Sequence, residues 1–223
     1  MNRRLAALLV PVLLAVAGCT ATGPERQTTS AGRAERPSPF ADCAALTRAP
    51  GPSGSAAPAG SSGSASGPAP TASAAAPTPT AGGPLLPELT LNCFTGGAPV
   101  ALRDVRGPAV VNLWASWCPP CRKELPAFQR LSERAAGRLQ VLGVNSRDTR
   151  TAAQSIGEDF GIRFPVLFDQ GEALQRELGR NALPLTLLVD AEGRVVHVDA
   201  SGALDDARLA ALVQRHLGLA VPA

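Results

Sequence analysis

The chain has 223 residues, 45% of them hydrophobic, and a formal net charge of +3, which allows one ordinary domain plus additional segments. Arg3 and Arg4 lie in a segment that we expect to be removed, and without them 19 basic residues (21 minus 2) face 18 acidic ones. Because basic and acidic residues are almost equal in number, the charge gives no electrostatic argument for nucleic-acid binding. Two histidines and one methionine supply few ligands for metal chemistry, and we expect no cofactor.

Residues 1–18 have the layout of a secretory signal peptide. Arg3 and Arg4 precede an apolar run from Leu5 to Ala17, which is shorter than the roughly 20 residues that a membrane-spanning helix needs. The letters VAGC at its end resemble a bacterial lipobox, which implies cleavage before Cys19 and a lipid on that cysteine. We therefore expect an extracytoplasmic lipoprotein, anchored to the bacterial cell membrane in an oxidising compartment. The alternative is plain secretion with a free Cys19.

A change of composition divides the rest of the chain. Residues 19–48 are small and polar except for a short island around Cys43, and we expect them to form a lipid-anchored spacer. Residues 49–84 contain only Ala, Pro, Gly, Ser and Thr. This composition cannot bury enough apolar surface to offset the entropy of ordering, so the linker should be disordered. The folded domain is expected over residues 85–223.

Hydrophobic periodicity then predicts alternating strands and helices. The predicted strands cover residues 88–94, 98–102, 109–115, 139–145, 165–168, 185–190 and 194–199. The predicted helices cover residues 119–134, 149–160, 171–178 and 205–217. Gly96-Gly97 indicates a hairpin between the first two strands, and the last two are joined too tightly for anything but an antiparallel pair. This order predicts an α/β fold in which a central mixed sheet, with an N-terminal hairpin, is flanked by helices.

The segment WASWCPPC, residues 114–121, carries the candidate chemistry. A strand leads into it and a helix leads out, so Cys118 should sit at the helix N-terminus, where free backbone N–H groups and the helix dipole stabilise a thiolate. Cys121 should lie about one turn deeper, from where it can attack a mixed disulfide. Pro119 and Pro120 are tolerated there, because the N–H groups of a first turn have no helical partner.

Other uses of a Cys-x-x-Cys pair fit this chain less well. Half of a zinc site would need a second ligand pair, but Cys43 and Cys93 are 50 residues apart and no closely spaced histidines exist. A copper chaperone would lack Met and His ligands. A purely structural disulfide spanning two residues in a helical turn would be strained and easily reduced.

The sequence VVNLWASWCPPCRKELPAF, residues 110–128, resembles the thioredoxin superfamily, in particular its TlpA/ResA-like branch of extracytoplasmic reductases. The similarity covers roughly residues 85–217. It implies a thioredoxin fold, with Cys118 as the attacking thiol, Cys121 as the resolving thiol and Pro184 as the family's cis-proline facing the disulfide. It also implies protein thiol and disulfide substrates, a CcdA-like membrane protein as the source of electrons, and cytochrome c maturation as one setting.

Asn112 stands where thioredoxins carry a buried aspartate that moves protons at the second cysteine, and the TlpA/ResA-like branch commonly has asparagine there. Since asparagine cannot titrate, Glu124 or water would have to accept the proton of Cys121. The alternative for Glu124 is a partner of the helix dipole. We expect Trp117 to shield the disulfide and Trp114 to lie in the core.

Five cysteines are an odd number, and assigning Cys19 to a lipid leaves two pairs. By elimination, Cys43 and Cys93 are expected to form a structural disulfide that closes a loop of about 50 residues. A second redox pair and two free thiols are the alternatives.

We expect the Cys118–Cys121 pair to act as a reductant. Pro119 and Pro120 bring no positive charge, and Pro119 removes an N–H that could solvate the thiolate, so reduced Cys118 should be less stabilised than in strongly oxidising relatives. Three other classes stay open: a disulfide donor, a thiol peroxidase and a non-catalytic adaptor. The motif disfavours a peroxidase, because peroxiredoxins usually carry a lone attacking cysteine with Thr or Ser three residues before it.

Overall fold

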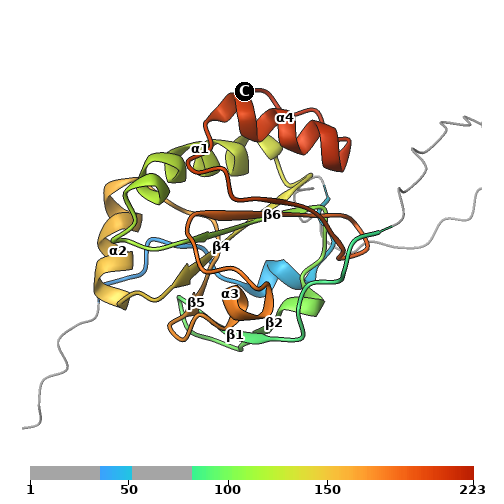
Figure 1. Ribbon diagram of the computed structural model, residues 1–223. Coiled ribbons are helices and arrows are strands. Elements are labelled where there is room, and N and C mark those ends of the chain that lie inside the picture. The colour runs from blue at the N-terminus through green and yellow to red at the C-terminus, as the bar shows by residue number, and fades with distance from the viewer. Residues whose placement is uncertain (1–35, 52–81) are drawn as a thin grey trace, which may run out of the picture. The chain divides into compact units, whose positions relative to one another are not determined.

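Among the described residues, seven strands form one mixed sheet at the centre of the fold, in the order β2-β1-β5-β4-β3-β6-β7 (Figure 1). The computed structural model describes residues 36–51 and 82–223. The expected signal peptide, Cys19 and most of the linker lie outside these ranges. The strands are β1 (Thr90–Cys93), β2 (Val100–Ala101), β3 (Ala109–Trp114), β4 (Gln140–Ser146), β5 (Val166–Asp169), β6 (Leu185–Val189) and β7 (Val195–Asp199).

Strand β3 lies in the interior of the sheet, and each of its side chains is buried. It pairs in parallel with β4 and antiparallel with β6. Its side chains alternate between two apolar layers, with Val110 and Trp114 in one and Val111 and Leu113 in the other. Gly143 on β4 leaves room for Trp114, since a Cβ there would come within 3.0 Å of the indole nitrogen.

In the described part of the chain, four α-helices cover the two faces of the sheet: α1 (Pro119–Ala135), α2 (Arg150–Asp159), α3 (Ala173–Glu177) and α4 (Asp206–Leu217). Helices α1, α2 and α4 contribute to the apolar layer that contains Trp114, whereas the short α3 packs through Leu174 into the opposite layer (Figure 1). Short 3-10 helices cover Ala44–Thr47 and Leu102–Asp104. The predicted mixed sheet, the β1–β2 hairpin and the antiparallel β6–β7 pair are confirmed.

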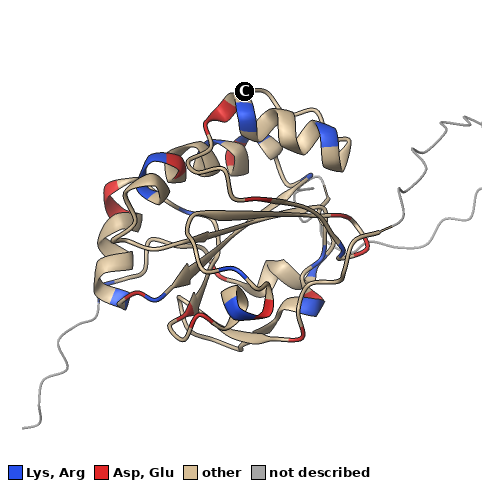
Figure 2. Cartoon of the chain, in the orientation of Figure 1, with Lys and Arg blue, Asp and Glu red and all other residues tan. Residues whose placement is uncertain are grey.

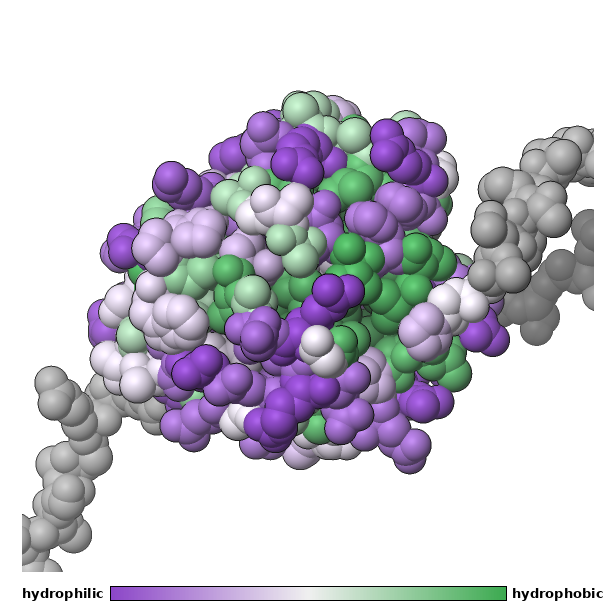
Figure 3. All heavy atoms as spheres, viewed as in Figure 1, coloured by the Kyte–Doolittle hydropathy of each residue, from purple (hydrophilic) through white to green (hydrophobic). Residues whose placement is uncertain are grey.

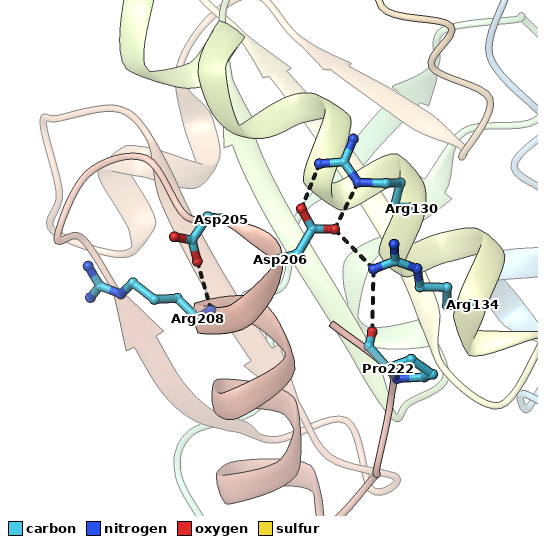
Figure 4. A network of polar contacts seen from close by, with 6 residues as sticks. All are labelled: Arg130, Arg134, Asp205, Asp206, Arg208 and Pro222. Carbon is cyan, nitrogen blue, oxygen red and sulfur yellow. Dashed lines mark hydrogen bonds and ion pairs between the residues drawn. The ribbon is translucent and has the colours of Figure 1, made fainter.

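Charged side chains join α1 to α4 at the surface. Asp206, in the first turn of α4, accepts hydrogen bonds from Arg130 and Arg134 of α1 (Figure 4). Asp205 caps the same helix by accepting from the Arg208 N–H at 2.9 Å. Because exposed ion pairs contribute little to stability, the contact between α1 and α4 depends mainly on their apolar faces.

The structure differs from the sequence prediction at the island around Cys43, which belongs to the folded unit and not to a spacer. The unit extends from Pro37 to Ala223, and we call residues 37–48 the strap. Phe40, Cys43 and Leu46 recur every three residues, and each is at most 4% exposed. The island alone is too short to indicate packing, because its partners are supplied by distant parts of the chain.

The strap lies across the end of the sheet at which β3, β4 and β5 begin. Backbone hydrogen bonds join it to Arg106, just before β3, and to Arg163, just before β5. Gln140, at the start of β4, donates to the Arg48 carbonyl at 2.7 Å. Because Cys118 follows the C-terminal end of β3, the strap and Cys118 lie at opposite ends of the strands.

The surface of the described residues is mixed in character. Figure 2 shows acidic and basic residues interspersed along the helices, and in Figure 3 apolar residues gather toward the middle of the same face. Among the large apolar side chains of residues 36–51 and 82–223, Leu85 and Trp117 are exposed. Within those two ranges, no helix combines the length and the apolar character needed to cross a membrane.

Candidate active site

Cys118 and Cys121 are joined in a disulfide of 2.04 Å where β3 ends and α1 begins. Cys118 is the N-cap of α1, and Cys121 lies in the first turn. Cys118 keeps 3% of its surface exposed and Cys121 none. An incoming sulfur therefore meets Cys118 first. As the N-cap, Cys118 also lies where the helix N-terminus can stabilise a thiolate.

Two prolines limit the hydrogen bonds available to the sulfur of Cys118. The Cys121 N–H donates to Cys118 Sγ at 3.2 Å, as in other side-chain caps of helix N-termini. Pro119 and Pro120 have no N–H. Of the three residues that follow Cys118, Cys121 is thus the one that can solvate a thiolate through its backbone.

Asn112 of β3 and Glu124 of α1 form a buried polar pair. Glu124 lies on the same face of α1 as Cys121, since residues three apart share a helix face. Asn112 Nδ2 donates to Glu124 Oε1 at 2.6 Å, and the Leu204 N–H donates to Oε2 at 3.0 Å. Asn112 and Glu124 are both fully buried. A glutamate that only complemented the helix dipole would face solvent, so its burial favours the other interpretation, a proton acceptor for Cys121.

Burial raises the pKa of Glu124 to about 7, although hydrogen bonds from Leu204 and Asn112 act to lower it. The carboxyl group therefore titrates near neutral pH and not in the acidic range of an exposed glutamate. Asn112 Oδ1 has no donor among the described residues, and a protonated Glu124 could supply one if the amide turned over. A separation of 2.6 Å also suits an O–H donor. The Glu124 carboxyl group can therefore take up and release a proton while it stays hydrogen-bonded to Asn112.

Replacing Glu124 by glutamine is expected to remove one component of the pH dependence of stability. Folding favours the protonated carboxyl group, so its contribution to the free energy of unfolding is complete below pH 4.5 and is lost as the pH rises through about 7. The loss amounts to about 3 kcal/mol. Urea unfolding measures the free energy of unfolding of oxidised wild type and of oxidised Glu124→Gln. The difference between the two proteins should change by this amount between acidic and mildly alkaline pH. A constant difference would contradict the assignment.

Asp148, which the sequence analysis did not single out, holds the segment in front of Cys118. Its carboxylate accepts from the Ser116 N–H at 2.6 Å and from the Ser116 hydroxyl at 2.7 Å. It also accepts from the Asn145 side chain and from the Thr149 N–H. The loop after β4 is thereby tied to the loop after β3. The signal that could have found Asp148 is its position, because functional side chains gather at the carboxyl ends of parallel strands.

We expect Asp148→Asn to lower the free energy of unfolding by about 2–4 kcal/mol, because an amide NH2 would face two of the four donors. Ser116→Ala is the matched control, and the loss of one hydroxyl hydrogen bond should cost about 1 kcal/mol. Urea unfolding of the oxidised variants compares the two. Equal losses would show that Asp148 does not hold this segment.

The surface beside Cys118 is formed by Trp117 and its neighbours. Trp117, expected to shield the disulfide, is 55% exposed, and its indole N–H donates to the Arg147 carbonyl at 2.9 Å. The guanidinium of Arg147 lies 5.9 Å from the ring centre and forms an ion pair with Glu172 at 2.6 Å. An open depression of about 400 Å³ adjoins these three side chains. The ring thus offers an apolar contact to a chain that approaches Cys118.

Pro184 immediately precedes β6, and the Leu183–Pro184 peptide bond is cis. Leu185 pairs with Leu113, which places Pro184 beside the end of β3, where the loop to Cys118 departs. A second cis bond, Gly107–Pro108, was not anticipated.

Cys43 and Cys93 form a second disulfide, of 2.00 Å, between the strap and β1. Both lie in the apolar layer opposite the one that contains Cys118 and Cys121. The sheet therefore separates the two disulfides. Among residues 36–51 and 82–223, no three His, Cys, Asp or Glu side chains are grouped so that they could hold a metal ion.

One known family and several known proteins resemble part of the chain. The family model described as Redoxin matches residues 53–212, well over half of the chain. The thiol-disulfide oxidoreductase ResA of Bacillus thuringiensis (strain Al Hakam) is 30% identical over 102 residues, or 45% of this chain. ResA of Bacillus subtilis (strain 168) is 33% identical over 107 residues, or 47% of this chain. The chain spans 59% of the length of each of these two curated relatives.

Solved structures resemble the fold. A secreted thiol-disulfide isomerase from Corynebacterium glutamicum is 26% identical with a TM-score of 0.52, over 60% of this chain and 83% of that protein. A DsbF homologue from Corynebacterium diphtheriae is 27% identical with a TM-score of 0.52, over 59% of this chain and 85% of that protein. The likeness confirms the predicted thioredoxin fold.

Proposed function

Because the chain belongs to the Redoxin family, we propose that it is a thiol–disulfide oxidoreductase that reduces disulfides in other proteins through Cys118 and Cys121. One observation carries the proposal: the two cysteines share a disulfide at the start of α1, in which Cys118 keeps 3% of its surface exposed and Cys121 is fully buried. A pair that opens and closes needs this asymmetry, because one sulfur must meet the substrate while the other waits.

The reaction begins with the reduced pair. The Cys118 thiolate attacks one sulfur of the substrate disulfide, and the other substrate sulfur leaves as a thiolate and takes a proton from solvent. Cys121 then gives its proton to the Glu124 carboxylate and attacks Cys118 Sγ, so the mixed disulfide breaks and the second substrate thiolate leaves, to be protonated in turn. Two electrons pass to the substrate, and the Cys118–Cys121 disulfide forms. A carboxyl group with a pKa of about 7 is matched to this proton transfer at neutral pH.

Electrons flow from the protein to its substrate in this proposal. A strong oxidant stabilises its reduced form through a well-solvated thiolate. Here Cys121 is the sole N–H donor in the three residues after Cys118. Weak stabilisation of the thiolate makes the reduced pair a better donor of electrons.

The setting that we propose is extracytoplasmic, with a lipid on Cys19 as the membrane anchor and a CcdA-like membrane protein as the reductant. The layout of residues 1–18 and the letters VAGC support the anchor. The Cys43–Cys93 disulfide supports an oxidising compartment, because such bonds rarely persist in the cytosol. Proteins with haem-attachment cysteines, as in cytochrome c maturation, are the substrates that the sequence resemblance suggests.

The reduction potential of Cys118–Cys121 tests the proposal. A Cys19→Ser protein is equilibrated in thiol buffers, alkylated, and analysed by mass spectrometry so that the two cysteine pairs are counted separately. A potential near or below about −270 mV would support a reductant, whereas a value above about −180 mV would indicate a disulfide donor or isomerase. Rapid turnover of peroxide would indicate a peroxidase. A variant that lacks both Cys118 and Cys121 and still functions would indicate an adaptor.

Pro120→His is expected to raise this potential by about 30 mV or more. The variant restores a backbone N–H and adds a positive charge beside Cys118, and both changes stabilise the thiolate. One charge-assisted hydrogen bond of about 1.5 kcal/mol corresponds to about 30 mV for a two-electron couple. The same alkylation measurement detects the shift, and an unchanged potential would mean that the prolines do not set it.

A further inference from the structure

A row of polar residues crosses the sheet beneath Glu124. Asn112 on β3 pairs with Thr186 on β6, and Thr186 pairs with Asp199 on β7. Directly paired residues of antiparallel strands point to the same face of a sheet, so these three side chains share the face that α1 covers. Two strand spacings separate Asp199 from Asn112, or about 10 Å.

The loop after β7 closes over the same place. Asp199 begins this loop, and its Oδ1 accepts from the Ser201 N–H at 3.0 Å and from the Ser201 hydroxyl at 2.6 Å. Leu204 ends the loop and donates its N–H to Glu124 Oε2. The loop therefore connects a carboxylate at one end to the buried carboxyl group of Glu124 at the other.

Two basic side chains approach the second carboxylate oxygen of Asp199. Arg208 of α4 and His197 of β7 each come within 4.0 Å of Oδ2, and His216 of α4 stacks on His197 with 4.1 Å between the ring centres. Burial raises the pKa of Asp199, but the hydrogen bonds from Ser201 and the charges of Arg208 and His197 outweigh it and lower the pKa. Asp199 is therefore an anion at neutral pH.

We propose that Asp199 raises the proton affinity of Glu124, and thereby shifts the pH range over which Cys121 resolves a mixed disulfide. The second part rests on the proposed function, whereas the first part does not depend on it. An anion near a buried carboxyl group disfavours its ionisation, and Asp199 acts on Glu124 in this direction. Asp199 touches neither reacting sulfur, so it is a positioning residue that acts through Glu124.

Asp199→Asn tests this proposal, because asparagine Oδ1 can still accept from both Ser201 groups while the charge is lost. The Glu124 carboxyl group is titrated by carbon-13 NMR in the full oxidised chain, and its signal is assigned by its absence in Glu124→Gln. We expect the midpoint to fall by roughly 0.3 to 1 pH unit, as for a charge at about 10 Å. The pH profile of mixed-disulfide resolution should move in the same direction.

Three further variants separate charge from structure. Asp199→Glu keeps the charge and should keep the wild-type midpoint. Asp206→Asn removes a carboxylate at the start of α4 that pairs with α1 (Figure 4) and lies outside the row, so the midpoint should stay in place. Arg208→Gln removes a cation beside Asp199 and should raise the midpoint.

A midpoint that stays or rises in Asp199→Asn overturns the proposal, and so does an equal fall in Asp206→Asn. Should Asp199→Asn fail to fold, Asp199→Ser, which also removes the charge, decides: a lowered midpoint supports the proposal and an unchanged one overturns it. The titration needs no turnover. A chain with the expected shift but no disulfide reduction would therefore refute the proposed function and leave the link between Asp199 and Glu124 standing.

Discussion

Replacing Cys118 by serine is expected to lower the rate of disulfide reduction by at least about a thousandfold, because a hydroxyl group supplies almost no anion at neutral pH. Cys118 is the one of the two that keeps surface exposed at the N-cap of α1, so no neighbouring thiol can take over the attack. Reduction of insulin disulfides in the presence of dithiothreitol measures the effect.

Cys121→Ser is the matched control for that variant. Cys118 could still attack, but no second thiol would resolve the intermediate, so a mixed disulfide with the substrate should accumulate. Mass spectrometry detects this adduct and locates it. Turnover by Cys118→Ser close to that of wild type, or an adduct on Cys121 of that variant, would reverse the proposed roles.

Removal of the second disulfide, with Cys43→Ala and Cys93→Ala together, is expected to lower the free energy of unfolding by about 4 kcal/mol. The bond joins residues 50 apart, and the chain-entropy model gives that value for a loop of this length. The strap should also loosen, because packing and hydrogen bonds alone would then hold Phe40 and Leu46. Urea unfolding and hydrogen exchange at residues 37–48 measure the two effects.

The matched control removes the other disulfide, with Cys118→Ala and Cys121→Ala together. These cysteines are 3 residues apart, so the same model gives less than half of the loss. Disulfide reduction should disappear in this control and persist in the variant without Cys43 and Cys93. If that variant were as stable as wild type, the bond would have no structural role, and a second redox pair would be the interpretation left.

The elements that the sequence predicted correctly are those whose signal is local. Strand β3 is a continuous apolar run, α1 has apolar residues at helical spacing, and Gly96-Gly97 marks the β1–β2 turn. The predicted positions of Cys118 and Cys121 at the start of α1 followed from the same local reasoning, because a strand that feeds a helix fixes where the first turn lies.

The features that sequence reasoning missed depend on contacts between distant residues. Asp148 lies 32 positions from Ser116, and Asp199 reaches the row beneath Glu124 through the register of three strands. The strap looked like part of a spacer because Phe40 finds its partner, Phe94, 54 positions later, at 4.8 Å between the ring centres. Periodicity along the chain reports which side of an element is buried, but it does not report what lies against that side.

The Cys43–Cys93 bond turns part of the chain into a covalent ring that contains residues 52–81. A protease that cut this stretch would leave both products joined, so the nick would be invisible on a non-reducing gel and plain on a reducing one. A pulling force applied at the N-terminus would pass from the strap through the two sulfurs into β1, and residues 52–81 would carry none of it. Insertions in that stretch therefore leave the path of the load unchanged.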